Sequence, residues 1–124
     1  MLDVEVIGPP RRLPAGEVER MAALAAASAG IEDGHVAITF VSGERIAELN
    51  ERYRGKAGPT DVLSFPVDDG EAIGPRELGD VFIAPDHTAD LREAVVHGVL
   101  HLTGMDHETD DGEMLALQAE ILSW

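Results

Sequence analysis

Apolar and polar positions in the first forty residues predict a strand, a helix and a second strand. Residues 2–7 alternate apolar with mainly acidic side chains, which predicts a strand with one covered face. The alanine-rich stretch 14–30 predicts a helix, opened by its proline and ended by its glycine. Residues 35–41 carry the β-branched and aromatic side chains that are typical of a strand.

Residues 42–55 predict a second helix. The serine at the start of this segment is a suitable N-cap, and the glycine at its end is a suitable stop. Ile46, Leu49 and Tyr53 recur at helical spacing, so we expect them on one apolar stripe that faces the core.

The second half of the chain predicts two strands and two helices. Residues 61–67 and 78–84 predict strands that are separated by an acidic, glycine-containing excursion. Asp90 and Glu93 form a capping-box pattern before a helix that is apolar around most of its circumference, so this helix is expected to be central. A second capping-box pattern precedes a final helix; its two residues are Asp110 and Glu113, and its inward stripe is Met114, Leu117 and Ile121.

These elements predict one α+β domain over residues 1–124. We expect a small mixed four-stranded sheet covered by helices, because no repeat, linker or low-complexity run divides the sequence.

The segment HGVLHLTGMDH, residues 97–107, carries the main chemical signal. His97 and His101 are four residues apart, so on a helix both project from the same face. Gly104 can adopt the left-handed conformation that ends a helix, which lets the chain turn back and bring His107 toward the other two imidazoles. The sequence therefore predicts a metal ion bound by three histidines.

Three protein ligands leave a tetrahedral zinc ion with one open position, which is typical of a catalytic site. Structural zinc sites are usually closed by four ligands rich in cysteine, and this chain has no cysteine. The ligand spacing also matches the zinc protease signature HExxHxxGxxH, but Gly98 replaces the glutamate that serves there as general base. Three neutral imidazoles leave the ion doubly positive, which favours an anionic ligand such as a phosphodiester oxygen.

The alternative interpretation is that these histidines are ordinary ones, at a helix end, in a core gap and on the surface near Asp106 and Glu108. Their register around the glycine favours a metal site. His35 and His87 each stand alone, and for both we expect a turn or core position.

Composition and charge limit the possible partners and compartments. The first residues, MLDVEVIG, have no basic region before an apolar core, and no apolar run reaches the roughly 20 residues that cross a bilayer, so we expect a cytoplasmic protein that does not associate with membranes. The net charge of −15 is unfavourable for a polyanionic partner. Four of the nine Lys and Arg residues lie in the window 45–56, which is the one place where cationic density could meet a phosphate backbone. On charge alone, however, a solvated helix face paired with Glu44, Glu48 and Glu51 is the preferred interpretation of that window.

Three segments together resemble the YbeY family of bacterial endoribonucleases, also described as rRNA maturation factors. They are LNERYRGKAGPTDVLSFP at 49–66, ELGDVFIA at 77–84 and HGVLHLTGMDH at 97–107, and they cover most of the chain beyond residue 45. The resemblance implies one zinc ion per chain held by His97, His101 and His107, and cleavage of single-stranded RNA. It also implies a part in 16S ribosomal RNA processing and ribosome quality control, with the ribosome as partner and no DNA substrate, and it implies a functional requirement for Arg54.

Zinc at this site would bring the pKa of a bound water toward about 7. Either the resulting hydroxide or the ribose 2′-hydroxyl could then attack phosphorus, and a 2′,3′-cyclic phosphate product would indicate the second route. Arg54 could clamp a nonbridging phosphate oxygen, because a guanidinium is permanently charged and donates parallel hydrogen bonds. A salt bridge from Arg54 to Asp61 or to a neighbouring glutamate is the alternative that spacing leaves open.

Five further residues have two interpretations each. Arg52 and Lys56 could contact phosphates or be solvated side chains. Asp106 could orient a ligand imidazole or cap the turn after the metal-ligand helix. Tyr53 and Phe65 could stack on bases, but core packing is the preferred interpretation for both.

Two other functions remain as alternatives. A zinc peptidase or amidase fits the ligand spacing, but the missing glutamate argues against it. A non-catalytic ribosome assembly factor with a structural zinc ion fits the weak cationic surface.

Overall fold

The computed structural model describes residues 2–8, 13–58, 60–66, 76–104 and 112–123. Its elements are β1 (Leu2–Ile7), α1 (Ala15–Ser28), β2 (Gly34–Phe40), α2 (Gly43–Arg54), β3 (Val62–Pro66), β4 (Arg76–Ile83), the short 3-10 helix η1 (Pro85–His87), α3 (Leu91–Leu102) and α4 (Glu113–Leu122). Within this part of the chain, no helix is long and apolar enough to cross a membrane.

The four strands form one mixed sheet in the order β1-β2-β4-β3. The pairs β1–β2 and β2–β4 are parallel, and β3 runs antiparallel to β4. The predicted α+β class with a mixed four-stranded sheet is confirmed, and each predicted strand is present with bounds shifted by at most two residues.

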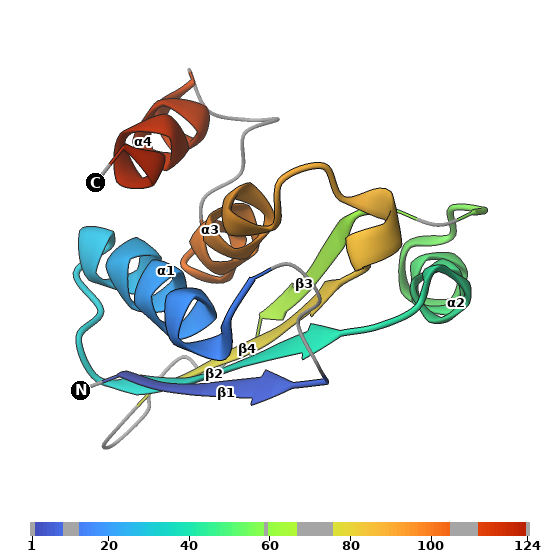
Figure 1. The fold of residues 1–124 in the computed structure, drawn as a ribbon, viewed down its shortest axis with the longest axis horizontal. Helices are drawn as coiled ribbons and strands as arrows, with labels where there is room; N and C mark the ends of the chain where they lie inside the picture. The colour runs from blue at the N-terminus through green and yellow to red at the C-terminus, as the bar shows by residue number, and fades with distance from the viewer. Residues whose placement is uncertain (1, 9–12, 59, 67–75, 105–111, 124) are drawn as a thin grey trace.

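Helices α1 and α3 cover one face of the sheet, and α4 packs outside them, as Figure 1 shows. The main core joins fully buried side chains of these helices and of the inner strands; they include Val18, Met21, Val36, Ile38, Val81, Ile83, Val95, Val99, Leu100, Met114 and Ile121. Helix α3 therefore lies centrally, as its nearly continuous apolar surface predicts.

A second, smaller core lies under α2. Its buried members are Ile46, Leu49, Leu63 and Ala84. Neighbouring strand residues point to opposite faces of a sheet. Leu63 therefore packs toward α2, while its neighbour Ser64 donates a hydrogen bond of 3.0 Å to the Gly98 carbonyl in α3. Strand β3 is thus covered by a helix on each side.

The ends of α2 are those expected from the sequence. The Ser42 hydroxyl accepts a hydrogen bond from the Arg45 amide at 3.1 Å. Gly55 closes the helix with φ +67, a left-handed conformation that glycine adopts without strain. The buried amide of Asn50 then donates to the Gly58 carbonyl at 3.0 Å and holds the following loop against the helix.

The caps of the other helices differ in part from expectation. Asp90 caps α3 by accepting from the Arg92 and Glu93 amides, which confirms that half of the capping box. Pro14 is the N-cap of α1 and not its first helical residue. The N-cap of α4 is Gly112, so the capping box expected from Asp110 does not open this helix; Asp110 itself lies outside the described residues.

Two predicted side-chain positions are wrong. Tyr53 is 60% exposed, because the buried residues of α2 are Ile46, Leu49 and Asn50, which all precede its last turn. His35 is neither a turn nor a core residue: its imidazole bridges Glu77 at 2.6 Å and Glu5 at 3.1 Å on the sheet face opposite α1. His87, in η1, is exposed and fits the expected turn position.

Candidate metal centre and cleft

Two of the three predicted ligands converge in the structure. His97 and His101 lie one turn apart on α3, and their Nε2 atoms are 3.1 Å from each other. The two rings meet edge to face with centroids 4.7 Å apart. Both side chains are half-buried. A buried helix that holds both imidazoles is a rigid support for a metal site.

Gln118, which was not among the predicted site residues, orients one of these imidazoles. Its side chain is buried on α4, and its Oε1 atom lies 2.8 Å from Nδ1 of His97. An amide oxygen only accepts hydrogen bonds, so Nδ1 carries a proton, and in the neutral ring the lone pair then lies on Nε2. A glutamine four residues after Met114 on an otherwise apolar stripe was the signal that could have revealed it.

The remaining residues proposed for this centre are His107 and Asp106, which lie outside the described residues. The chain leaves α3 through Gly104 with φ +101, the conformation expected for a turn at this glycine. Within the described ranges, no group of three His, Cys, Asp or Glu side chains is placed to hold a metal ion.

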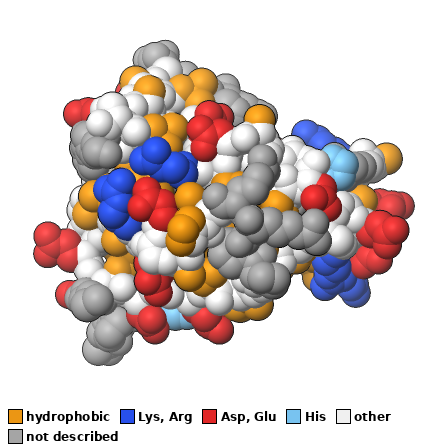
Figure 2. Space-filling model, in the orientation of Figure 1, with side chains coloured by type: hydrophobic (Ala, Val, Ile, Leu, Met, Phe, Trp, Pro, Cys, Tyr) orange, Lys and Arg blue, Asp and Glu red, His pale blue; other side chains and the backbone are white. Residues whose placement is uncertain are grey.

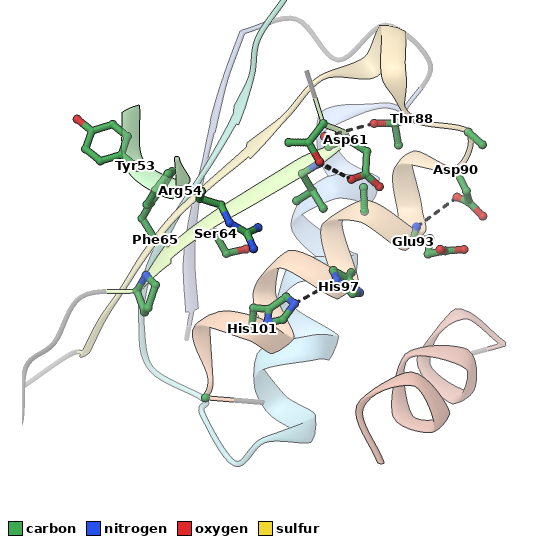
Figure 3. A pocket seen from close by; sticks show the side chains of 16 residues that line it. Tyr53, Arg54, Asp61, Ser64, Phe65, Thr88, Asp90, Glu93, His97 and His101 are labelled. Carbon is green, nitrogen blue, oxygen red and sulfur yellow. Dashed lines mark hydrogen bonds between the residues drawn. The ribbon is translucent and has the colours of Figure 1, made fainter. Parts of the chain in front are cut away.

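The histidine pair opens into a cleft with a volume of about 830 Å³, shown in Figure 3. It lies between α3, β3 and the C-terminal end of α2. Its polar and aromatic lining comprises Tyr53, Arg54, Thr60, Asp61, Ser64, Phe65, Thr88, Asp90, Glu93, His97 and His101. This cleft therefore combines the two histidines of α3 with groups from three other segments of the chain.

Arg54 lines the same cleft as the histidines. Figure 3 shows its side chain extending from the end of α2 over β3 toward their side of the cleft. Among the described residues, no carboxylate lies within ion-pair distance of Arg54, and the Asp61 carboxylate accepts instead from the Val62 amide at 2.9 Å. The salt bridge that spacing left open is therefore not formed with Asp61 or with the glutamates of α2.

The other basic residues of the 45–56 window differ from one another. Arg45 pairs with Glu48 at 3.0 Å, as a solvated helix face would. Arg52 and Lys56 are exposed and do not line the cleft. Within the described part of the chain, neither makes an ion pair with a carboxylate.

The cleft has a cationic and an acidic side. Arg54 stands at one side, whereas Asp61, Asp90 and Glu93 line another part of the wall. On the face that Figure 2 shows, acidic side chains are spread around the surface and basic ones gather in a few places. A polyanion would therefore approach from the Arg54 side, where repulsion is lowest.

Gly98 lies between the two histidines on α3, and a side chain at this position would point at the sheet. A Cβ atom at this position would be only 2.5 Å from Cγ1 of Val81 and 3.3 Å from Oγ of Ser64. The protease glutamate that occupies this position in the spacing signature has no room here, so the helix–sheet contact excludes it.

The family model described as Endoribonuclease YbeY matches residues 15–124, a span that contains Arg54, His97, His101 and Gln118. The chain belongs to this family. The resemblance that the three sequence segments indicated is thereby confirmed.

Similar curated proteins carry the same description. "Endoribonuclease YbeY" of Bacillus cytotoxicus is 43% identical, covering 79% of this chain and 78% of its own length. That of Bacillus subtilis is 37% identical, covering 86% and 82%. The solution structure of TM1509 from Thermotoga maritima superposes with a TM-score of 0.57 at 26% identity, over 96% of this chain and 86% of that one.

Proposed function

We propose that this protein is a zinc-dependent endoribonuclease that cleaves single-stranded RNA. The observation that carries the proposal is the pair of facing Nε2 atoms of His97 and His101 in a cleft that Arg54 also lines. The description of the family and of its curated relatives supports the reaction class.

The residues present fit a zinc ion. Two nitrogen ligands at 2.0–2.1 Å on a tetrahedral ion are separated by about 3.3 Å, close to the 3.1 Å between these Nε2 atoms. The hydrogen bond of His97 to Gln118 fixes the tautomer whose Nε2 atom can bind a metal. We propose His107 as the third ligand, from its place after the turn at Gly104, with one ion per chain.

Zinc held there would supply Lewis acidity and a nucleophile or base near neutral pH. The groups of the chain bind and orient the substrate. Arg54 donates to a nonbridging oxygen of the scissile phosphate, while Asp61 and Glu93 keep the rest of the phosphate backbone away from the opposite wall. The attacking group is either water or the ribose 2′-hydroxyl, and a 2′,3′-cyclic phosphate end would identify the latter.

The same proposal includes a role in 16S ribosomal RNA processing and ribosome quality control in the cytoplasm. It rests on the motif resemblance, with Arg52 and Lys56 as phosphate contacts outside the cleft and Asp106 as a group that orients a ligand. With a net charge of −15, binding to the ribosome would depend on the small cationic area at the end of α2.

The test combines elemental analysis of protein purified without added metal with an RNA cleavage assay on the same sample. We expect about one zinc per chain and cleavage of single-stranded RNA that stops when a chelator removes the metal. His101→Ala should lose both, and His87→Ala, which alters an exposed histidine outside the cleft, should keep both. Metal-free protein that cleaves at the full rate would overturn the proposal.

Two other functions have their own tests. A peptidase would digest casein when zinc is added, and the contact between Gly98 and Val81 argues against it. The test of an assembly factor with structural zinc is the His101→Ala variant. If this variant stays folded, loses its metal and still supports ribosome maturation, the function does not depend on catalysis.

A further inference from the structure

Tyr53 occupies an unusual position for an aromatic side chain. It lines the cleft next to Arg54, yet 60% of it is exposed. The other exposed large apolar side chains in the described residues are Ile7 and Leu115, which lie on β1 and α4 and not at the cleft. An isolated exposed ring at the mouth of a site is a candidate contact for a ligand.

Packing on one side holds the Tyr53 ring in place. Its centroid lies 5.3 Å from that of Phe65, and the two ring planes meet at 68°. Phe65 in turn meets Phe82 at 5.7 Å and 72°. Both phenylalanines pack against the small core under α2. The ring is therefore supported from below and presented to solvent in a fixed orientation, which lowers the entropy cost of binding a planar partner.

The charges around Tyr53 indicate the kind of partner. The Arg52 guanidinium lies over the ring, 5.7 Å from its centroid, and Arg54 follows directly on the same helix. An exposed ring with one guanidinium over it and a second next to it in the sequence suits a nucleotide, because the base can stack while the phosphate meets a guanidinium. The acidic wall formed by Asp90 and Glu93 leaves this side as the entry for a phosphate chain.

We propose that Tyr53 is a stacking platform for the nucleobase next to the phosphate that Arg54 holds. This inference rests on the proposed endoribonuclease function and adds a base subsite to it. Bases are free to stack on a side chain only where the RNA is unpaired, so the platform also accounts for a preference for single strands. Stacking is tolerant of base identity, and the subsite should therefore accept any of the four bases.

The experiment measures binding of a fluorescent single-stranded 2′-O-methyl RNA octamer by anisotropy, with gel analysis to confirm that it stays intact. Stacking energies of about 1–3 kcal/mol per base predict a rise in Kd of about 5- to 150-fold for Tyr53→Leu. Tyr53→Phe keeps the ring and should bind within about twofold of the parent. Leu115→Ala is the matched control, since it removes an exposed apolar side chain outside the cleft.

Octamers with one abasic position test the parent protein without any substitution. The parent protein should bind the abasic octamer more weakly than the intact octamer. The Tyr53→Leu variant should bind the two octamers equally well, because it has no ring on which the base could stack. If the parent and Tyr53→Leu bind the intact and the abasic octamers with equal Kd, Tyr53 is not a stacking platform. That result would leave the proposed RNA cleavage unaffected. A parent protein that neither binds nor cleaves RNA would instead overturn the proposed function.

Discussion

The Oε1 atom of Gln118 lies 2.8 Å from Nδ1 of His97 and joins the last helix to the predicted metal centre. Because Gln118 is buried and the α4 helix packs against α3, the bond fixes the orientation of the imidazole from behind. The C-terminal helix therefore has a role in the site besides its contribution of Met114 and Ile121 to the core.

Gln118→Leu should lower zinc affinity by about 10- to 100-fold, because the His97 ring loses the acceptor that fixes its tautomer and angle. Gln118→Glu keeps an acceptor at the same place and should retain most of the affinity. Competition with a chromophoric chelator measures both variants. Equal affinities for the parent and the leucine variant would show that this hydrogen bond does not orient a ligand.

Arg54→Ala should reduce RNA cleavage by about 10- to 100-fold, since a charge-assisted hydrogen bond contributes about 1.5–3 kcal/mol. Arg45→Ala is the matched control: this arginine lies on the same helix but pairs with Glu48 and does not line the cleft. The measurement is the cleavage rate of the parent and of both variants on the same oligonucleotide. If the two variants cleave equally fast, Arg54 is not a phosphate ligand.

Gly98→Ala should lower the free energy of unfolding by about 1–3 kcal/mol, because the new methyl group would overlap Val81 in a fully packed core. Gly16→Ala in α1 is the control, as nothing lies within 4 Å of its added Cβ and alanine favours helices. Urea unfolding curves give both values. A neutral or stabilising Gly98→Ala would mean that α3 and β4 can separate without cost.

The pH dependence of stability should carry a contribution from His35. Partial burial lowers the pKa of His35, but the hydrogen bonds to Glu77 and Glu5 and the charges of Glu77 and Asp3 outweigh it and raise the pKa above 6.5. A raised folded-state pKa means that protonation stabilises the fold. This stabilisation is complete below about pH 6.5, the unfolded value, and is lost as the pH rises through the folded value.

His35→Gln should remove this pH-dependent contribution, which is at most about 1 kcal/mol because the partner carboxylates are exposed. The measurement is the difference in unfolding free energy between parent and variant at pH 5.5 and pH 8.5. We expect the difference to be larger at the lower pH. A difference that is unchanged or larger at pH 8.5 would contradict the assignment.

Local sequence patterns determined most of the secondary structure. Period-two alternation defined β1, and the serine and glycine at the two ends of α2 defined its length. These signals act over a few residues, through side-chain periodicity and backbone caps, so they can be recognised in the sequence. The spacing of His97 and His101 belongs to the same class, because the helix itself brings residues four apart onto one face.

Contacts between elements that are distant in the chain required the tertiary structure. Helical spacing placed Tyr53 on the apolar stripe, but in the fold its ring meets Phe65 of β3 edge to face and stays largely exposed. His35 acquires two carboxylate partners only because β1 and β4 flank β2. The lack of space at Gly98 likewise depends on the distance between α3 and β4.

By itself the sequence determined the elements, the helical histidine pair and the family, since each depends on short-range spacing or on local motifs. The tertiary structure alone decided that Arg54 shares a cleft with those histidines, that Gln118 orients one of them and that Tyr53 is exposed at the entrance. The physical reason is that these relationships depend on how helices pack on the sheet, and packing geometry is set by the whole core at once.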